Sequence, residues 1–190
     1  MSTMQPKPVL YLVVCAAPPA QRIDELIELL HQADWNVCVI PTPRAVSWLD
    51  RPALVQQTGY PVRHDHRQPG DPDALPRADA IVVAPATFNT INKWSAGISD
   101  TFALGILNEA FGLNLPTVVA PYAKSSLAAH PEFSRSLEKL NAWGVNVLPN
   151  EAIRTKTKKL ESTTEDEPAP RFHWQPVVAA VMKTFEPSQR

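Results

Sequence analysis

The chain has 190 residues, 44% of them hydrophobic, which is typical of one globular domain with a substantial core. Its 18 basic and 19 acidic side chains give a net charge of -1, so the composition provides no attraction to nucleic acid or to an anionic membrane. No apolar run approaches the roughly 18 residues of a membrane-spanning helix, and both cysteines lie within apolar runs, as expected of buried thiols in a cytoplasmic protein.

The first predicted unit is a strand followed by a helix. Residues Val9 to Ala16 contain enough β-branched and aromatic side chains to predict a buried central strand. Because this short run follows a single positive charge, a strand explains it better than a signal peptide. After Ala-Pro-Pro-Ala at 17–20, apolar residues recur at the spacing of one helix face as far as about Ala33: Ile23, Leu26, Ile27 and Leu30.

The second unit has the same order. Val37 to Ile40 predicts a strand, and a proline-containing turn leads into a helix from Val46 to about Gln57, for which Gly59 is a plausible C-cap. Tyr60 to Arg63 is compatible with a short strand. The proline-rich stretch from His64 to Arg77 predicts a loop.

The third unit, Ala78 to Leu104, is the stretch around which the chain is organised. An apolar strand from Ala80 to Ala84 is followed by a small-polar turn and a long helix, predicted from Thr90 to Phe111. The N–H groups at the helix start, with the short side chains of Thr87, Asn89 and Thr90, would face the carboxyl end of the sheet, where open α/β folds bind ligands. The alternative is an ordinary turn with Asn89 as the N-cap.

The rest of the chain continues the alternation. Pro116 to Ala120 and Val145 to Leu148 predict strands on either side of an amphipathic helix, Pro131 to Ala142. Five strands alternating with helices predict a single α/β domain over residues 1–190, built on a doubly wound parallel sheet. The charged segment 150–170 is interpreted as a flexible loop or lid, and 174–186 as a last packing helix.

The central stretch also resembles a known family. Pro85 to Thr90 reads PATFNT and is followed by Lys93, Gly97, Ile98 and Asp100. This pattern is similar to the PASANT motif and the helix after it in the homo-oligomeric flavin-containing cysteine decarboxylases, which include phosphopantothenoylcysteine decarboxylase and peptidyl-cysteine decarboxylases. The resemblance continues more thinly from about Val9 to Leu148.

The resemblance implies a fold, a cofactor and an activity. The fold would be a three-layer, Rossmann-like sheet of the flavodoxin type, and the cofactor FMN. The activity would be oxidative decarboxylation of a cysteine-like or peptidyl C-terminal substrate, in a homo-oligomer that is a trimer or a multiple of trimers. An FMN-binding protein without decarboxylase activity, and an enzyme like the flavin prenyltransferases, are the alternatives.

The resemblance also implies cofactor-binding residues. In the second loop Thr42 matches the hydroxyl that meets the FMN phosphate, and Trp48 matches an aromatic residue close to the flavin; the alternatives are a turn residue and a core aromatic. The central motif adds Ala86, Thr87, Asn89, Thr90 and Asp100. The family's glycine- and serine-rich first loop is replaced by prolines, which lack an N–H donor, so Gln21, Arg22 or Arg44 would have to supply phosphate contacts.

The candidate catalytic residues depart from the family pattern. Counting back from Asp79 places Asp71 where the family has its catalytic histidine, so His64 and His66 are the histidines that a shifted loop would deliver. Two histidines on one face of an extended segment also suit a metal ion, but no third ligand cluster is visible and no metal site is predicted.

The loop at 121–131 shows a second departure from the family. Lys124 stands where the family has the asparagine that binds the substrate carboxylate, and the clamp cysteine of the phosphopantothenoylcysteine enzymes has no counterpart. A lysine ammonium attracts a carboxylate, though with a different geometry from an amide. The alternative is a solvent-facing lysine.

Overall fold

The computed structural model describes residues 6–66, 70, 75–154 and 172–185. Within these residues, five parallel strands form one sheet in the order β2-β1-β3-β4-β5. The strands are β1 (Val9–Val14), β2 (Asn36–Pro41), β3 (Ala80–Ala86), β4 (Thr117–Pro121) and β5 (Asn146–Val147). The predicted doubly wound parallel sheet is confirmed.

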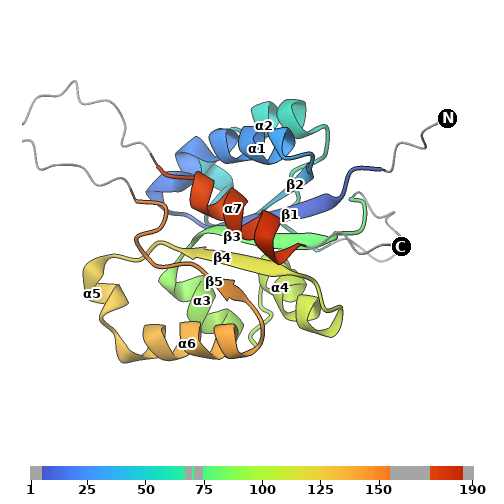
Figure 1. Cartoon of the computed structure of the whole chain (residues 1–190). Coiled ribbons are helices and arrows are strands. Elements are labelled where there is room, and N and C mark those ends of the chain that lie inside the picture. The colour runs from blue at the N-terminus through green and yellow to red at the C-terminus, as the bar shows by residue number, and fades with distance from the viewer. Residues whose placement is uncertain (1–5, 67–69, 71–74, 155–171, 186–190) are drawn as a thin grey trace, which may run out of the picture.

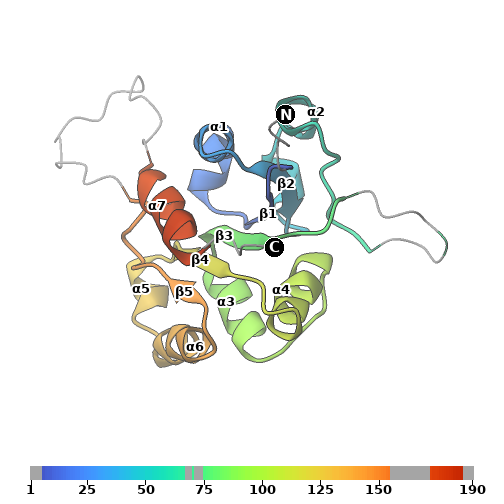
Figure 2. The ribbon, with the colours of Figure 1, turned by 45° about the vertical axis from the view of Figure 1, so that its right-hand side comes forward.

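Helices cover both faces of the sheet (Figure 1, Figure 2). One face carries α1 (Ile23–Gln32), α2 (Arg51–Thr58) and α7 (Gln175–Thr184). The other carries α3 (Phe88–Ser95), α4 (Phe102–Gly112), the short α5 (Ser125–Ala128) and α6 (Pro131–Ala142). Two 3-10 turns, η1 (Pro18–Arg22) and η2 (Val46–Trp48), follow the ends of β1 and β2.

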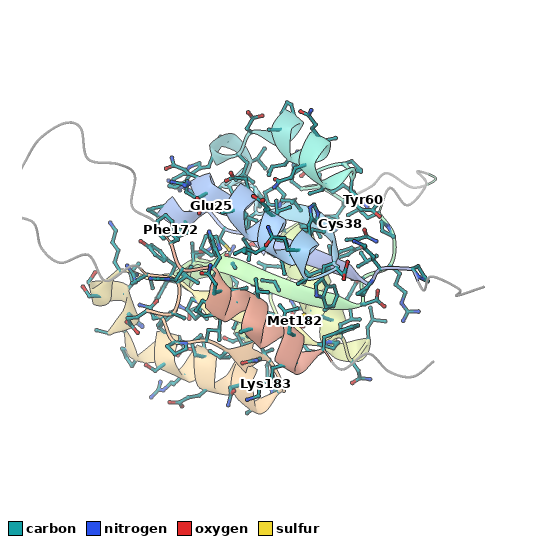
Figure 3. The ribbon with its side chains drawn as sticks, turned by 45° about the horizontal axis from the view of Figure 1, so that its top comes forward. Glu25, Cys38, Tyr60, Phe172, Met182 and Lys183 are labelled. Atoms are coloured by element: carbon teal, nitrogen blue, oxygen red, sulfur yellow. The ribbon has the colours of Figure 1, made fainter. Side chains whose placement is uncertain are left out.

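The four longer strands, β1 to β4, are buried on both sides because each side faces a layer of helices. In β1, Leu10 and Leu12 belong to the core under α1 and α7, whereas Val9 and Val13 belong to the core under α3 and α4. Figure 3 shows the first of these layers, with Met182 exposed on the outer side of α7.

The prediction of one continuous helix from Thr90 to Phe111 is wrong. This segment consists of α3 and α4, and α3 begins earlier, with Thr87 rather than Asn89 at the N-cap. Gly97 has a φ of 74° and ends α3 in a Schellman motif, in which Gly97 N–H bonds to Trp94 O and Ile98 N–H to Lys93 O. Thr101 then caps a new helix, its hydroxyl accepting a bond from Leu104 N–H at 3.2 Å.

Two further predicted elements differ from the structure. The helix predicted from Val46 to Gln57 is divided into η2 and α2, because Asp50 caps α2 with a bond from Ala53 N–H and Pro52 occupies its first turn. Gly59 is the C-cap, as expected. Tyr60 to Arg63 form no strand; this segment lies beside β2 with a bond of 3.3 Å from Arg63 N–H to Val39 O.

The C-terminal part of the chain is described in two pieces. Most of the segment 150–170, predicted as a flexible loop, lies outside the described residues, namely 155–170, and so does Asp71. An antiparallel bridge pairs Arg154 with Phe172, and α7 occupies the region predicted as the last helix.

Candidate functional site

A cavity of about 510 Å³ lies at the carboxyl ends of β1, β2 and β3. This is where the strand order reverses, since the chain leaves β1 for β2 on one side and returns to β3 on the other; open α/β sheets bind ligands at such a point. The volume falls in the range of about 300–1,000 Å³ typical of small-molecule sites. The lining residues are Ala16, Thr42, Pro43, Arg44, Thr87, Asn89, Thr90, Lys93, Thr101 and Leu104.

The β3–α3 connection forms one wall. Strand β3 is buried throughout and ends at Ala86, after which Thr87 turns the chain into α3. The hydroxyl oxygens of Thr87 and Thr90 are 3.2 Å apart, and the buried thiol of Cys15 donates to Thr90 Oγ1 at 3.3 Å. Two hydroxyls and the start of a helix therefore face one cavity.

The turn after β2 forms the opposite wall. Thr42 N–H donates to Val14 O at 2.8 Å, and Ala45 N–H donates to Thr42 O at the same distance. This compact turn places Thr42 and the exposed Arg44 at the cavity. A hydroxyl and a guanidinium beside a helix start are donors suited to an anionic group.

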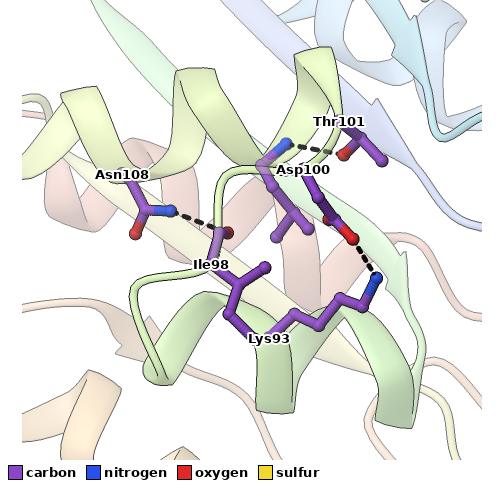
Figure 4. A network of polar contacts seen from close by, with 6 residues as sticks. Lys93, Ile98, Asp100, Thr101 and Asn108 are labelled. Atoms are coloured by element: carbon purple, nitrogen blue, oxygen red, sulfur yellow. Dashed lines mark hydrogen bonds and ion pairs between the residues drawn. The ribbon is translucent and has the colours of Figure 1, made fainter.

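The loop between α3 and α4 is held by polar contacts, which Figure 4 shows from close by. Lys93 Nζ is 2.5 Å from Asp100 Oδ2. Asn108 Nδ2 donates to Ile98 O at 3.0 Å and to Ser99 Oγ at 2.8 Å. Lys93 lines the cavity directly, whereas Asp100 reaches it only through its ion pair with that lysine.

His66 packs against the start of α4. The His66 ring meets the Phe102 ring edge-on, with 5.5 Å between the centroids. The Arg63 guanidinium lies 4.5 Å from the centroid of the Phe102 ring. A Cβ on Gly105 would lie 3.6 Å from His66 Cε1, which is ordinary contact. The first turn of α4 also supplies Thr101 and Leu104 to the cavity, so His66 lies against an element of the site.

Other predicted residues are not brought into this cavity. His64 Nδ1 is 2.8 Å from Asp65 Oδ2. Trp48 lines a different hollow, of about 270 Å³, between α1 and α2. Lys124 is exposed at the N-cap of α5.

The loop that carries Lys124 is anchored by residues that the sequence did not suggest. The carboxamide of Asn150 accepts a bond from Ala123 N–H at 2.8 Å and donates to Ala123 O at 3.1 Å. Arg154 donates to the same carbonyl at 2.6 Å and lies 3.9 Å from the centroid of the Tyr122 ring. No local pattern marks these residues, because the contact joins positions 27 or more apart in the chain.

Two other kinds of feature are absent from the described residues. No group of three or more histidine, cysteine or acidic residues among them is arranged to hold a metal ion. None of the described helices is long and apolar enough to cross a membrane.

Comparison with known proteins assigns the chain to a family. The family model described as Flavoprotein matches residues 1–186. The coenzyme A biosynthesis bifunctional protein CoaBC of Thermococcus kodakarensis is 38% identical over 72 residues, which are 38% of this chain and 18% of that protein. Phosphopantothenoylcysteine decarboxylase of Oryza sativa subsp. japonica is 33% identical over 72 residues, or 38% of this chain and 32% of that protein. The matches thus span less than a third of these relatives.

Solved structures share the fold over nearly the whole chain. A PPC decarboxylase mutant complexed with pantothenoylaminoethenethiol has a TM-score of 0.71 at 22% identity, covering 93% of this chain and 97% of that one. The FMN-dependent cysteine decarboxylase SpaF has a TM-score of 0.70 at 19% identity, covering 94% and 98%. With the family model matching nearly every residue, the chain belongs to the Flavoprotein family, as its central motif predicted.

Proposed function

We propose that this protein binds FMN in the cavity at the ends of β1, β2 and β3 and is an FMN-dependent decarboxylase of a cysteine-like or peptidyl C-terminal substrate. The observation that carries the proposal is the position and lining of the cavity in a chain of the Flavoprotein family. In sheets of this strand order, the point between β1 and β3 is where FMN binds.

The residues present fit a phosphorylated flavin. Thr42 and Arg44 offer a hydroxyl and a cation for a phosphate, and the hydroxyls of Thr87 and Thr90 suit a polyhydroxyl chain. Leu104 adds apolar surface for a ring system. The pocket therefore combines anion-binding, hydrogen-bonding and apolar groups.

The two cations of the cavity are not equivalent. Lys93 is neutralised by Asp100, whereas Arg44 forms no ion pair within the described part of the chain. A phosphate dianion is stabilised most by the cation that has no partner of its own. We therefore assign the phosphate to the β2 side of the cavity, at Thr42 and Arg44.

The proposed chemistry divides between the cofactor and the chain. Bound FMN would supply the electron acceptor that oxidises the cysteine side of the substrate and makes loss of CO₂ feasible. The chain would bind and orient the substrate and move protons. For proton transfer we favour His66 over His64 and Asp71, because His66 is held against α4, an element of the cavity.

The substrate carboxylate is assigned to Lys124. Its ammonium is exposed on a loop that Asn150 and Arg154 fix in place, so the charge is presented from a rigid support. Neither Lys124 nor Trp48 lines the cavity of its own chain. A neighbouring subunit of a homo-oligomer, with three subunits or a multiple of three, would bring such residues to the site, and we include this assembly in the proposal.

A second function has a specific observation in its favour. Lys124 replaces an amide with a cation, and Asp71 stands at the position expected for a histidine, so the chain has changed the residues that act on the substrate while keeping those that suit the flavin. A flavin-binding protein without decarboxylase activity would show this pattern.

The experiment that separates the two functions measures CO₂ release. Protein loaded with FMN would be incubated with free cysteine, peptides ending in cysteine, and phosphopantothenoylcysteine. The decarboxylase proposal predicts CO₂ from one of these substrates and its loss in Lys124→Ala. Bound FMN with no CO₂ from any of them would favour the non-catalytic flavoprotein.

A further inference from the structure

A buried thiol lies behind the cavity, and the proposed function gives it no role. Cys15 directly follows β1, is 1% exposed and belongs to the core under α3 and α4. Its N–H donates to Pro85 O at 3.1 Å, so the residue joins the ends of β1 and β3. Burial raises the pKa of the Cys15 thiol, which keeps it a neutral S–H donor.

This thiol begins a chain of hydrogen bonds that ends at the cavity. Cys15 Sγ donates to Thr90 Oγ1 at 3.3 Å, and Thr90 Oγ1 is 3.2 Å from Thr87 Oγ1. The thiol proton occupies one of the two acceptor sites of the Thr90 hydroxyl, and either threonine hydroxyl can donate in the bond between them. The Thr87 hydroxyl is thereby tied to Thr90 at a point where both residues line the cavity.

Thr87 occupies the N-cap of α3 without capping it. A threonine at this position usually accepts a bond from an N–H of the first helical turn, but the Thr87 side chain makes no such bond. The first N–H groups of a helix have no partner within it. In α3 they belong to the segment that lines the cavity, so they stay available beside the Thr87 hydroxyl.

We propose that Cys15 is a positioning residue for the FMN site: through Thr90 it holds the Thr87 hydroxyl away from the helix cap, so that this hydroxyl and the start of α3 both face the ligand. The inference rests on the proposed function, because FMN is the ligand concerned. Cys15 does not line the cavity and acts only through the two threonines.

The test is a titration of the FMN-free protein with FMN, in which binding is monitored by the quenching of flavin fluorescence. Cys15→Ala and Cys15→Val both remove the thiol donor, and the valine also fills the volume of the cysteine side chain. Each should raise the Kd for FMN about fivefold, which corresponds to the loss of one hydrogen bond. Cys15→Ser keeps a donor and should stay within about twofold of wild type. Cys38→Ala is the matched control, because Cys38 is also buried in the same core but, among the described residues, has no hydrogen bond to the threonines of the cavity.

A double-mutant cycle distinguishes positioning from packing. In a Thr90→Val background the bond from Cys15 to Thr90 is already absent, so Cys15→Ala should weaken FMN binding less than it does in the wild type. Additive losses, or unchanged binding in both donor-free variants, would overturn the inference while leaving FMN binding intact. Wild-type protein that takes up no FMN would refute the proposed function itself, and the inference with it.

Discussion

The cavity is built from a few short side chains at strand ends, and at this scale Arg44 has the most specific role. It is exposed, borders the cavity and has no ion pair among the described residues. Thr42 lies beside it in the same turn. The assignment of the phosphate to this side can be tested with two ligands that differ only in the phosphate.

We expect Arg44→Ala to weaken FMN binding about tenfold and to leave riboflavin binding unchanged, since a charge-assisted bond to the phosphate is lost and riboflavin has none. Fluorescence titration with each ligand gives the two dissociation constants. Arg51→Ala is the control, because Arg51 is exposed at the start of α2 and does not line the cavity. Equal losses for both ligands would place the phosphate elsewhere.

The second cysteine gives a prediction about alkaline stability. Burial raises the pKa of Cys38 from 9.0 to about 12. The folded state thus keeps this proton where the unfolded chain has lost it, so stability is complete below pH 9 and falls as the pH rises from 9 toward 12.

Between about pH 8 and about pH 10, this thiol should lower the free energy of unfolding by about 1 kcal/mol. Urea denaturation of wild type and Cys38→Ala at both pH values checks it. The free energy of unfolding is compared between the two pH values within each protein, so the cost of the cavity left by the alanine cancels. An equal pH dependence in the two proteins would show that the thiol titrates normally.

At the scale of elements, the break between α3 and α4 shapes the site. Gly97 ends α3, and the loop from Ala96 to Thr101 brings Asp100 back to Lys93. One continuous helix could not form this ion pair in the same way, because positions seven apart are two turns away from each other. The ion pair at the edge of the cavity therefore depends on a helix stop.

Gly97→Ala should destabilise the protein by about 1 kcal/mol, because a Cβ is disfavoured at a φ of 74°. No atom beyond the two adjacent residues lies within 4 Å of the added Cβ, so the cost comes from the backbone conformation. Gly112→Ala is the matched control: it also meets open space, but Gly112 lies within α4, where alanine is tolerated or stabilising. Urea denaturation compares them, and equal effects would contradict this account of the helix stop.

The same elements show what the sequence could predict. The four longer strands were predictable because they are apolar on both faces. The cavity residues Thr87 and Thr90 were predicted from the turn that follows a strand, and Thr42 from the family resemblance. The helix stop was missed because Ile98 and Phe102 continue the apolar spacing of α3 across Gly97. In the structure Ile98 is 42% exposed.

Contacts between distant segments could not be predicted at all. The loop before α5 is held by Asn150 and Arg154, which are polar residues in a turn of no particular pattern. Likewise, His66 and His64 are two residues apart in one loop, and their tertiary contacts distinguish them: His66 packs on Phe102, whereas His64 is paired with Asp65. Propensity and spacing describe local segments, whereas these contacts depend on the assembled sheet.

At the scale of the whole molecule, the single chain provides the proposed flavin pocket but leaves Lys124 and Trp48 outside it. The proposed assembly predicts that the purified protein elutes as a trimer, or a multiple of one, of its 21.0 kDa chain. Size-exclusion chromatography with light scattering measures this mass directly. A monomer that still binds FMN would show that the site needs no neighbouring subunit.

The central claim is that the cavity at the ends of β1, β2 and β3 is an FMN site, and the visible absorbance spectrum of the purified protein tests it most directly. We predict a flavin spectrum, with the chromophore released on denaturation identified as FMN, and loss of that spectrum when Thr87 and Thr90 are both replaced by valine. A folded wild-type protein that shows no flavin absorbance, even after incubation with FMN, would contradict the account.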